Sequence, residues 1–322
     1  MASKRKSAAR GLKLTRLCLW NCGAEGAPTE PQAASATRVG GQAVIEGVMM
    51  QNGHRIAVAV RTPGGEIEVR PLERPLKGGW WTKVPLLRGP VRLYEMLSLG
   101  MRALKLSAEL ASGEVEKASR WEFPLMVVTA LALVGGGFVA LPVYLAGLLG
   151  IKQQLVANLV EGGVRVAFFL LYLAGISLIP DIRRVFQYHG AEHQAVHAYE
   201  AGRPDLELAR KKSPLHPRCG TTFLLLAVVI SILVFSLLPA REVWLRILAR
   251  LALLPLVAGI AYEVLMVGGR HPRAWWLKPF LVPGLLLQRL TTRKPTEDQL
   301  EVALAALDYV TSERAASSST TS

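Results

Sequence analysis

Cysteine is scarce in this 322-residue chain, because Cys18, Cys22 and Cys219 are the only three. They are too few and too scattered for a disulfide framework, which excludes a disulfide-stapled secreted domain and indicates a reducing compartment. The basic N-terminus also lacks the apolar stretch and the small-residue cleavage site of a secretory signal. We therefore interpret residues 1–37 as a flexible basic extension.

Acidic residues are also in short supply, with 24 Asp and Glu against 38 Lys and Arg, while 51% of the chain is hydrophobic. The apolar residues gather in runs near 20 residues long, which match the roughly 30 Å hydrocarbon slab of a bilayer. The predicted spans are residues 124–149, 164–180, 221–239 and 247–267. A further run, residues 279–290, is too short to cross and contains Pro283 and Gly284, so it is predicted to be interfacial or re-entrant.

The basic residues are unevenly divided between the two sides of this four-span arrangement. Thirty-three of the 38 Lys and Arg fall on one side and five on the other. Because positive charge is retained in the cytoplasm, the bias places both termini and the segment 181–220 there. We expect a multi-pass membrane protein in contact with the lipid bilayer.

Residues 38–123 predict a small cytoplasmic domain that contains strands. Alternating residues in 55–61 and 66–70 flank a Thr-Pro-Gly-Gly turn, which is typical of a β-hairpin. In residues 86–110 apolar side chains recur every three or four positions, which predicts an amphipathic helix. That helix lies either on the membrane surface or in the core of the domain.

The expected fold class is therefore mainly α: a polytopic helical membrane protein of about four spans with a small α+β cytoplasmic domain. The membrane domain covers residues 124–290 and includes a cytoplasmic, histidine-rich loop at 181–220. Residues 291–322 are predicted to form a C-terminal cytoplasmic helix and a disordered tail.

Three of the six histidines, His189, His193 and His197, fall within nine residues. On an α-helix, residues four apart are offset by only about 40°, so adjacent histidines can hold one ion from one face. The sequence HGAEH at 189–193 matches the H-x-x-E-H pattern of inverted zincins, in which two histidines hold zinc and the glutamate activates a water. Glu192 is therefore the predicted catalytic base.

A second zincin-like spacing, at 193–197, carries Gln194 where the base should be and predicts no catalysis. Downstream, His216 and Cys219 add an imidazole and a thiol, and a mixed His and Cys site for Zn2+ is chemically ordinary. Glu200 and Glu263 could complete that site or orient its imidazoles. The alternatives are histidines that face solvent or lipid head groups, a Cys219 that packs as a small hydrophobe, and a Glu263 that pairs with a nearby arginine.

Three blocks, GGQAVIEGVMM at 40–50, YHGAEH at 188–193 and HPRCGT at 216–221, resemble the YqhQ-like bacterial membrane proteins, an uncharacterised family of predicted metal-dependent enzymes. The resemblance covers residues 38 to about 306. It implies a protein of the bacterial plasma membrane with a metal site. It also links the glycine-rich block to the histidines, so that Gln42 and Glu46 either approach the same site or belong to a purely structural block.

Two functions follow from these patterns. The first is a membrane-embedded, metal-dependent hydrolase, although Gly190 inside the motif disfavours a helix there. The second is a non-enzymatic scaffold or accessory factor whose basic face docks on the ribosome, the protein-insertion machinery or anionic lipid, consistent with a net charge of +14. Positive-inside topology alone accounts for such basic segments, and four spans without paired broken helices argue against a transporter.

Overall fold

The computed structural model describes residues 39–75, 79–82, 84–113, 121, 125, 128–129, 132–151, 153–238, 242–270 and 278–312. The predicted extension at 1–37 and the tail beyond 312 lie outside these residues. The described part is mainly helical with one small sheet, which confirms the coarse fold class.

The sheet is a four-stranded antiparallel meander in the order β1, β2, β3, β4. Its strands are β1 (Val39–Val44), β2 (Gly47–Asn52), β3 (Arg55–Arg61) and β4 (Ile67–Pro71). The predicted hairpin is β3 and β4, and the glycine-rich block before it forms a hairpin of its own, β1 and β2. Its tight turn contains Glu46, whose φ is 50°.

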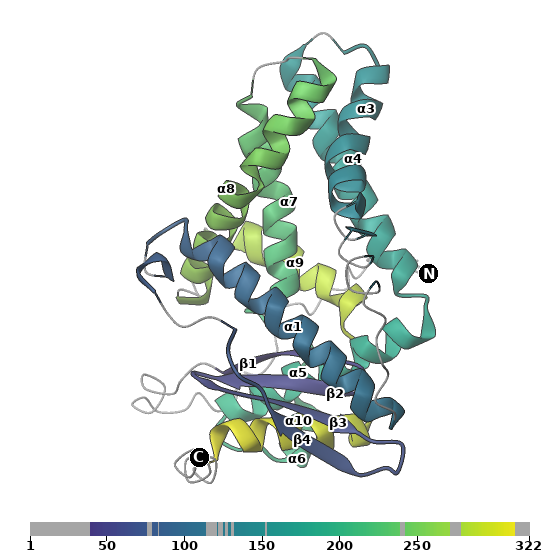
Figure 1. Ribbon diagram of the computed structural model, residues 1–322, viewed down its shortest axis with the longest axis vertical. Helices are drawn as coiled ribbons and strands as arrows, with labels where there is room; N and C mark the ends of the chain where they lie inside the picture. Colours follow the sequence, from purple (N-terminus) through teal and green to yellow (C-terminus); the bar gives the residue numbers. More distant parts are fainter. Residues whose placement is uncertain are drawn as a thin grey trace, which may run out of the picture. The chain divides into compact units, whose positions relative to one another are not determined.

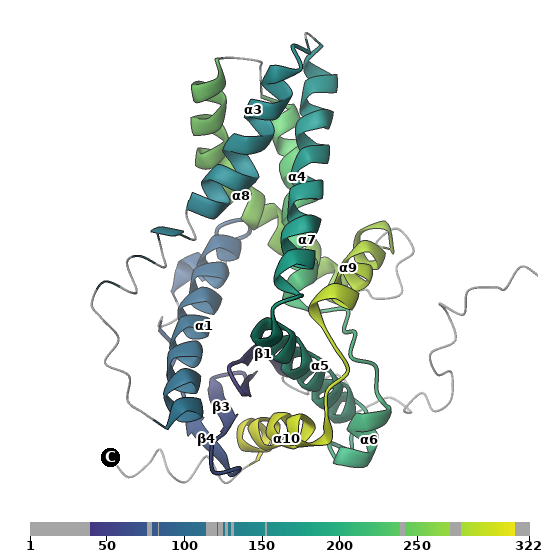
Figure 2. The same ribbon diagram turned by 90° about the vertical axis from the view of Figure 1, so that its right-hand side faces the viewer.

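Both faces of this sheet are buried (Figure 2). Helix α1 (Arg88–Ser112) packs Leu99 and Ala103 against Met49 and Val58. The next residue along β2, Met50, points to the opposite face, because side chains alternate along a strand. That face is covered by α5 (Pro180–Glu200) and α10 (Glu297–Thr311). The amphipathic helix is therefore a core helix of the sheet domain along this stretch.

Small residues bring α10 close to the sheet. Ala57 and Ala59 of β3 pack in the same cluster as Ala303 and Ala306 of α10, and all four side chains are fully buried. Helix α10 begins with a capping box in which the Thr296 side chain accepts from the backbone of the third residue and the Gln299 side chain accepts from the Thr296 N–H. The helix predicted in 291–322 is thus part of the domain core.

The remaining long helices run side by side (Figure 1). They are η2 (Leu133–Ala140), a π-helix that leads into α3 (Leu141–Leu148), α4 (Gln154–Ile176), α7 (Gly220–Ser236) and α8 (Val243–Arg270). The short helices η1 (Trp80–Thr82) and α6 (Leu206–Lys211) lie in connections. Helix α9 (Lys278–Thr291) packs on α7. It continues through Pro283 and Gly284, so these two residues do not interrupt the helix.

Two of the described helices are long and apolar enough to cross a membrane, judged by length and composition: Val156–Ile176 in α4 and Val243–Gly268 in α8. Shorter apolar helices, Gly135–Leu148 and Gly220–Ser236, coincide with the first and third predicted spans. The second predicted span, 164–180, begins eight residues after Val156, because Glu161 interrupts the apolar run. Segment 181–220, predicted as a loop, contains helices α5 and α6.

A buried cluster of charged side chains joins α4 to α8. The carboxylate of Glu161 pairs with both Arg246 and Arg250, and Glu161 and Arg250 are 1% and 2% exposed. Arg165 lies nearby, where its Nε donates to the carbonyl oxygen of Phe138 at 2.8 Å. The cluster fixes the relative position of the two longest apolar helices.

Candidate metal centre

The structure places four histidines in a continuous row. His189, His193 and His197 share one face of α5, and His216 comes from the segment between α6 and α7. The ring centroids of His189 and His193 are 4.5 Å apart, those of His193 and His216 are 5.6 Å apart, and those of His216 and His197 are 4.6 Å apart. The sequence-predicted imidazoles therefore lie together.

Backbone carbonyls fix the orientation of the three α5 rings. A carbonyl oxygen only accepts hydrogen bonds, so the imidazole nitrogen that contacts it must carry the proton. The pairs are His189 Nδ1 with Thr291 O at 2.8 Å, His193 Nδ1 with Pro214 O at 2.5 Å, and His197 Nε2 with Leu215 O at 2.9 Å. In each neutral ring the other nitrogen keeps its lone pair, as metal-binding histidines do.

Cys219 completes the first group of potential ligands. It is the N-cap of α7, it is 5% exposed, and its Sγ lies 3.2 Å from Nε2 of His189. One potential ligand atom each from His189, His193 and Cys219 lies within 4.8 Å of the others. Two imidazoles and one thiol at this spacing fit a zinc ion.

His197, Glu200 and His216 form a second group with the same 4.8 Å spacing. Nε2 of His216 lies 3.6 Å from Oε2 of Glu200 and is buried without a hydrogen-bond partner among the described residues. The other oxygen of Glu200 pairs with Arg218. Glu200 is therefore close enough to act as a ligand, as the sequence allowed.

Glu192 is buried beside both groups. Its Oε2 is 3.6 Å from Nε2 of His193, and its carboxylate accepts a hydrogen bond from the backbone of Gly41. Burial raises the pKa of Glu192, while His189, His216 and the Gly41 hydrogen bond oppose that rise. A carboxyl group whose pKa is shifted toward neutrality is suited to general acid–base work.

Burial also favours the neutral form of His193, His197 and His216. It lowers the pKa of His193 and of His216, and it lowers the pKa of His197 to about 4. Neutral imidazole is the form that binds a metal ion, so these rings need lose no proton to the solvent at pH 7 before binding.

Two glycines allow the chain to approach the site closely. A Cβ on Gly190 would lie 2.0 Å from the carbonyl oxygen of Arg293, where the chain leaving α9 crosses α5. A Cβ on Gly41 would lie 2.4 Å from the carbonyl oxygen of Met49 and 3.1 Å from Cγ of Glu192. Gly190, which disfavours a helix by propensity alone, is therefore needed for close packing.

The glycine-rich block meets the site through its backbone. The side chain of Glu46 pairs with Arg184 and accepts from the hydroxyl of Tyr188 at 3.3 Å, so it lies outside the histidine row. Gln42 points to the other face of the sheet, where it lies against Gly100 of α1. The Gly41 backbone is thus the link between the block and Glu192.

Two further polar side chains bear on the site. Glu263 pairs with Arg88 at 2.5 Å, which is the alternative of an arginine partner, and it belongs to neither group of potential ligands among the described residues. Gln288 of α9, which sequence reasoning missed, accepts from the His216 N–H and donates to the His216 carbonyl oxygen, both at 2.8 Å. The only sequence signal for Gln288 was that it and Arg289 are the polar residues of the run 279–290.

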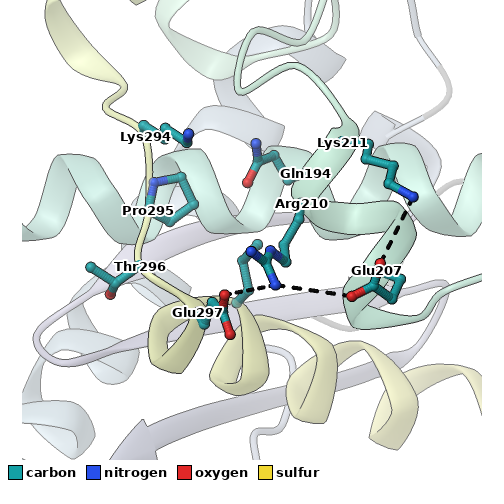
Figure 3. Close-up of a pocket in the computed structure, with 9 residues that line it drawn as sticks. Gln194, Glu207, Arg210, Lys211, Lys294, Pro295, Thr296 and Glu297 are labelled. Atoms are coloured by element: carbon teal, nitrogen blue, oxygen red, sulfur yellow. Dashed lines mark ion pairs between the residues drawn. The ribbon is translucent and has the colours of Figure 1, made fainter.

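A cleft of about 630 Å³ lies between α5, α6 and the start of α10, apart from the candidate ligands (Figure 3). Arg210 pairs there with Glu297 at 2.7 Å, and Lys294 and Lys211 add positive charge. Gln194 faces this cleft, and its amide donates to the Lys212 carbonyl oxygen at 2.6 Å. Gln194 is thus a structural residue, in agreement with the absence of a base at this position.

Comparison with known proteins gives a family and no activity. A family model described as "Protein of unknown function (DUF1385)" matches residues 84–313. The chain is 35% identical over 290 residues to the "Uncharacterized protein YqhQ" of Bacillus subtilis (strain 168), which covers 84% of this chain and 91% of the relative. No solved structure matches the chain significantly.

Proposed function

Because the chain belongs to the DUF1385 family, which is described as one of unknown function, we propose from the site itself that it is a metal-dependent hydrolase. The observation that carries this proposal is the arrangement of His189, His193 and Cys219. Two imidazole protons are held by backbone carbonyls, and the free lone pairs lie beside a buried thiol and the carboxylate of Glu192.

His189, His193 and Cys219 would hold the ion, and nitrogen and sulfur donors favour zinc over magnesium or calcium. A bound ion supplies Lewis acidity, which polarises a scissile carbonyl or phosphoryl bond. Glu192 would take the proton of the attacking water, since its Oε2 is next to His193 and its carboxylate is positioned by the Gly41 N–H. The surrounding burial limits access of bulk water to the carboxylate.

The first test is the metal content of the detergent-purified full chain, prepared without chelator and measured by mass spectrometry. We expect at least one zinc ion per chain in the wild type and one ion fewer in the double variant His189→Ala with His193→Ala. The control is His54→Ala, an exposed histidine in the turn after β2. Absence of metal from the wild type would refute the proposal and leave the docking scaffold as the better explanation.

A second variant separates binding from catalysis. Glu192→Gln preserves the shape of the side chain but removes the base, so it should retain zinc while hydrolysis falls by about 10²–10⁴-fold. Turnover is measured on a panel of chromogenic esters, peptides and phosphate esters. Unchanged turnover in Glu192→Gln would exclude Glu192 as the base.

We further propose that the helices η2–α3, α4, α7 and α8 lie in the bacterial plasma membrane, with the histidine row on the cytoplasmic side. Supporting this, large apolar side chains face outward from them, including Leu171, Leu233 and Leu248 at 72%, 60% and 57% exposed. Exposed apolar surface on this scale is typical of a lipid or protein contact. The excess of basic residues on the side of the sheet domain gives the orientation.

Reporter fusions test this topology. Alkaline phosphatase inserted at Gly150, between α3 and α4, should be active because that loop is exported, whereas a fusion after residue 312 should be inactive. Green fluorescent protein at the same two positions should give the reverse pattern. Phosphatase activity at the C-terminal position would contradict the proposed orientation.

A further inference from the structure

The row of histidines divides into two pairs. The ring centroids are 4.5 Å apart in the pair His189 and His193, and 4.6 Å apart in the pair His197 and His216. Between the pairs, the ring centroids of His193 and His216 are 5.6 Å apart. Each pair has its own additional donor, the thiol of Cys219 for the first and the carboxylate of Glu200 for the second. Six donors at two centres exceed the four that one tetrahedral zinc ion accepts.

We propose that this centre binds two divalent ions, one at His189, His193 and Cys219 and a second at His197, Glu200 and His216. This inference rests on the proposed function, which requires only the first ion. The second site is supported by an unpartnered buried atom, because Nε2 of His216 faces Glu200 at 3.6 Å and the His216 side chain is only 7% exposed.

The neighbours of the second group orient it for binding. The Leu215 carbonyl oxygen holds the Nε2 proton of His197, which leaves the Nδ1 lone pair free. Arg218 holds one oxygen of Glu200, so the other faces His216. In the structure, Nδ1 of His216 accepts a long hydrogen bond, 3.3 Å, from the Arg218 N–H. Binding of an ion through Nε2 would move the ring proton from Nε2 to Nδ1 and break that hydrogen bond.

The two donor sets differ in chemistry. A thiolate with two imidazoles is a soft set that favours zinc, whereas two imidazoles with a carboxylate form a three-ligand set of the kind that leaves one coordination position open. The Oε2 atom of Glu192 lies 3.6 Å from Nε2 of His193 in the first group, and its carboxylate also interacts electrostatically with His216 of the second. Two ions flanking one carboxylate is the arrangement of two-metal hydrolases.

The test is the number of zinc ions per chain in the reconstituted, detergent-purified full chain. We expect two in the wild type and in His54→Ala, and one in each of two double variants, His189→Ala with Cys219→Ser and His197→Ala with Glu200→Gln. Circular dichroism and size-exclusion chromatography check that each variant is folded. One ion in the wild type overturns the second site but leaves the hydrolase proposal standing, whereas no ion overturns both.

Cobalt titration of the wild type gives a measurement that needs no variant. The first equivalent of Co2+ should produce a thiolate-to-cobalt charge-transfer band, and the visible ligand-field bands should continue to grow through a second equivalent. Saturation of both signals at one equivalent would show a single ion and overturn the proposal.

Discussion

Glu161→Gln should lower the free energy of unfolding by about 3–5 kcal/mol, because it leaves the buried Arg250 and the half-buried Arg246 without a carboxylate. Both arginines contact Glu161, and Arg250 is 2% exposed. The amide retains the size of the side chain, so the effect is one of charge rather than of packing. The measurement is the thermal or denaturant midpoint in detergent.

Glu242→Gln is the matched control for this prediction. Glu242 lies just before α8, near the same end of the helix, but it is exposed, and among the described residues its carboxylate accepts a hydrogen bond from Trp244. Its replacement should change stability by less than about 0.5 kcal/mol. Equal midpoints for the two variants would mean that the buried cluster contributes nothing to holding α4 against α8.

Gly190→Ala should destabilise the protein by about 3 kcal/mol and should also reduce its zinc content. The new Cβ would lie 2.0 Å from the carbonyl oxygen of Arg293, which is backbone and cannot rotate away. Moving that segment also moves the Thr291 carbonyl oxygen, which holds the Nδ1 proton of His189. Thermal unfolding and metal analysis of the same preparation measure both effects.

Gly175→Ala provides the comparison for that variant. Gly175 also lies inside a helix, α4, but no atom lies within 4 Å of the position its Cβ would take. Alanine should therefore be neutral or stabilising by up to about 1 kcal/mol, through its higher helix propensity. If Gly190→Ala is as well tolerated as Gly175→Ala, the close crossing at Arg293 does not exist in solution.

Sequence patterns predicted the elements whose formation depends on residues close together in the chain. The hairpin of β3 and β4 follows from alternation and a Pro-Gly-Gly turn, and α1 follows from its apolar period. The buried face of α10 could not be predicted from the sequence. Its alanines pack against Ala57 and Ala59, which lie on a strand some 245 residues earlier. Residues far apart in the chain leave no periodic signal of their contact.

The candidate site also has a part that the sequence predicted and a part that it did not. The spacing of His189, His193 and His197 follows from the helical repeat, and the thiol and imidazole downstream were named as candidate ligands by residue type, with a purely structural Cys219 as the alternative. The hydrogen-bond acceptors on the histidines could not be identified, because they are carbonyl oxygens of Thr291, Pro214 and Leu215 and every residue has one. Sequence thus predicts side-chain donors but not the backbone that orients them.

The contacts from α9 have a consequence for biosynthesis. All the proposed ligands lie between residues 189 and 219, yet Gln288 holds the His216 backbone and the Thr291 carbonyl oxygen orients His189. A nascent chain that has emerged only as far as α8 therefore carries every ligand without these supports. On the proposed function, the ordered centre would form only late in translation, after residue 293 has left the ribosome, and metal loading would follow the insertion of the apolar helices rather than guide it.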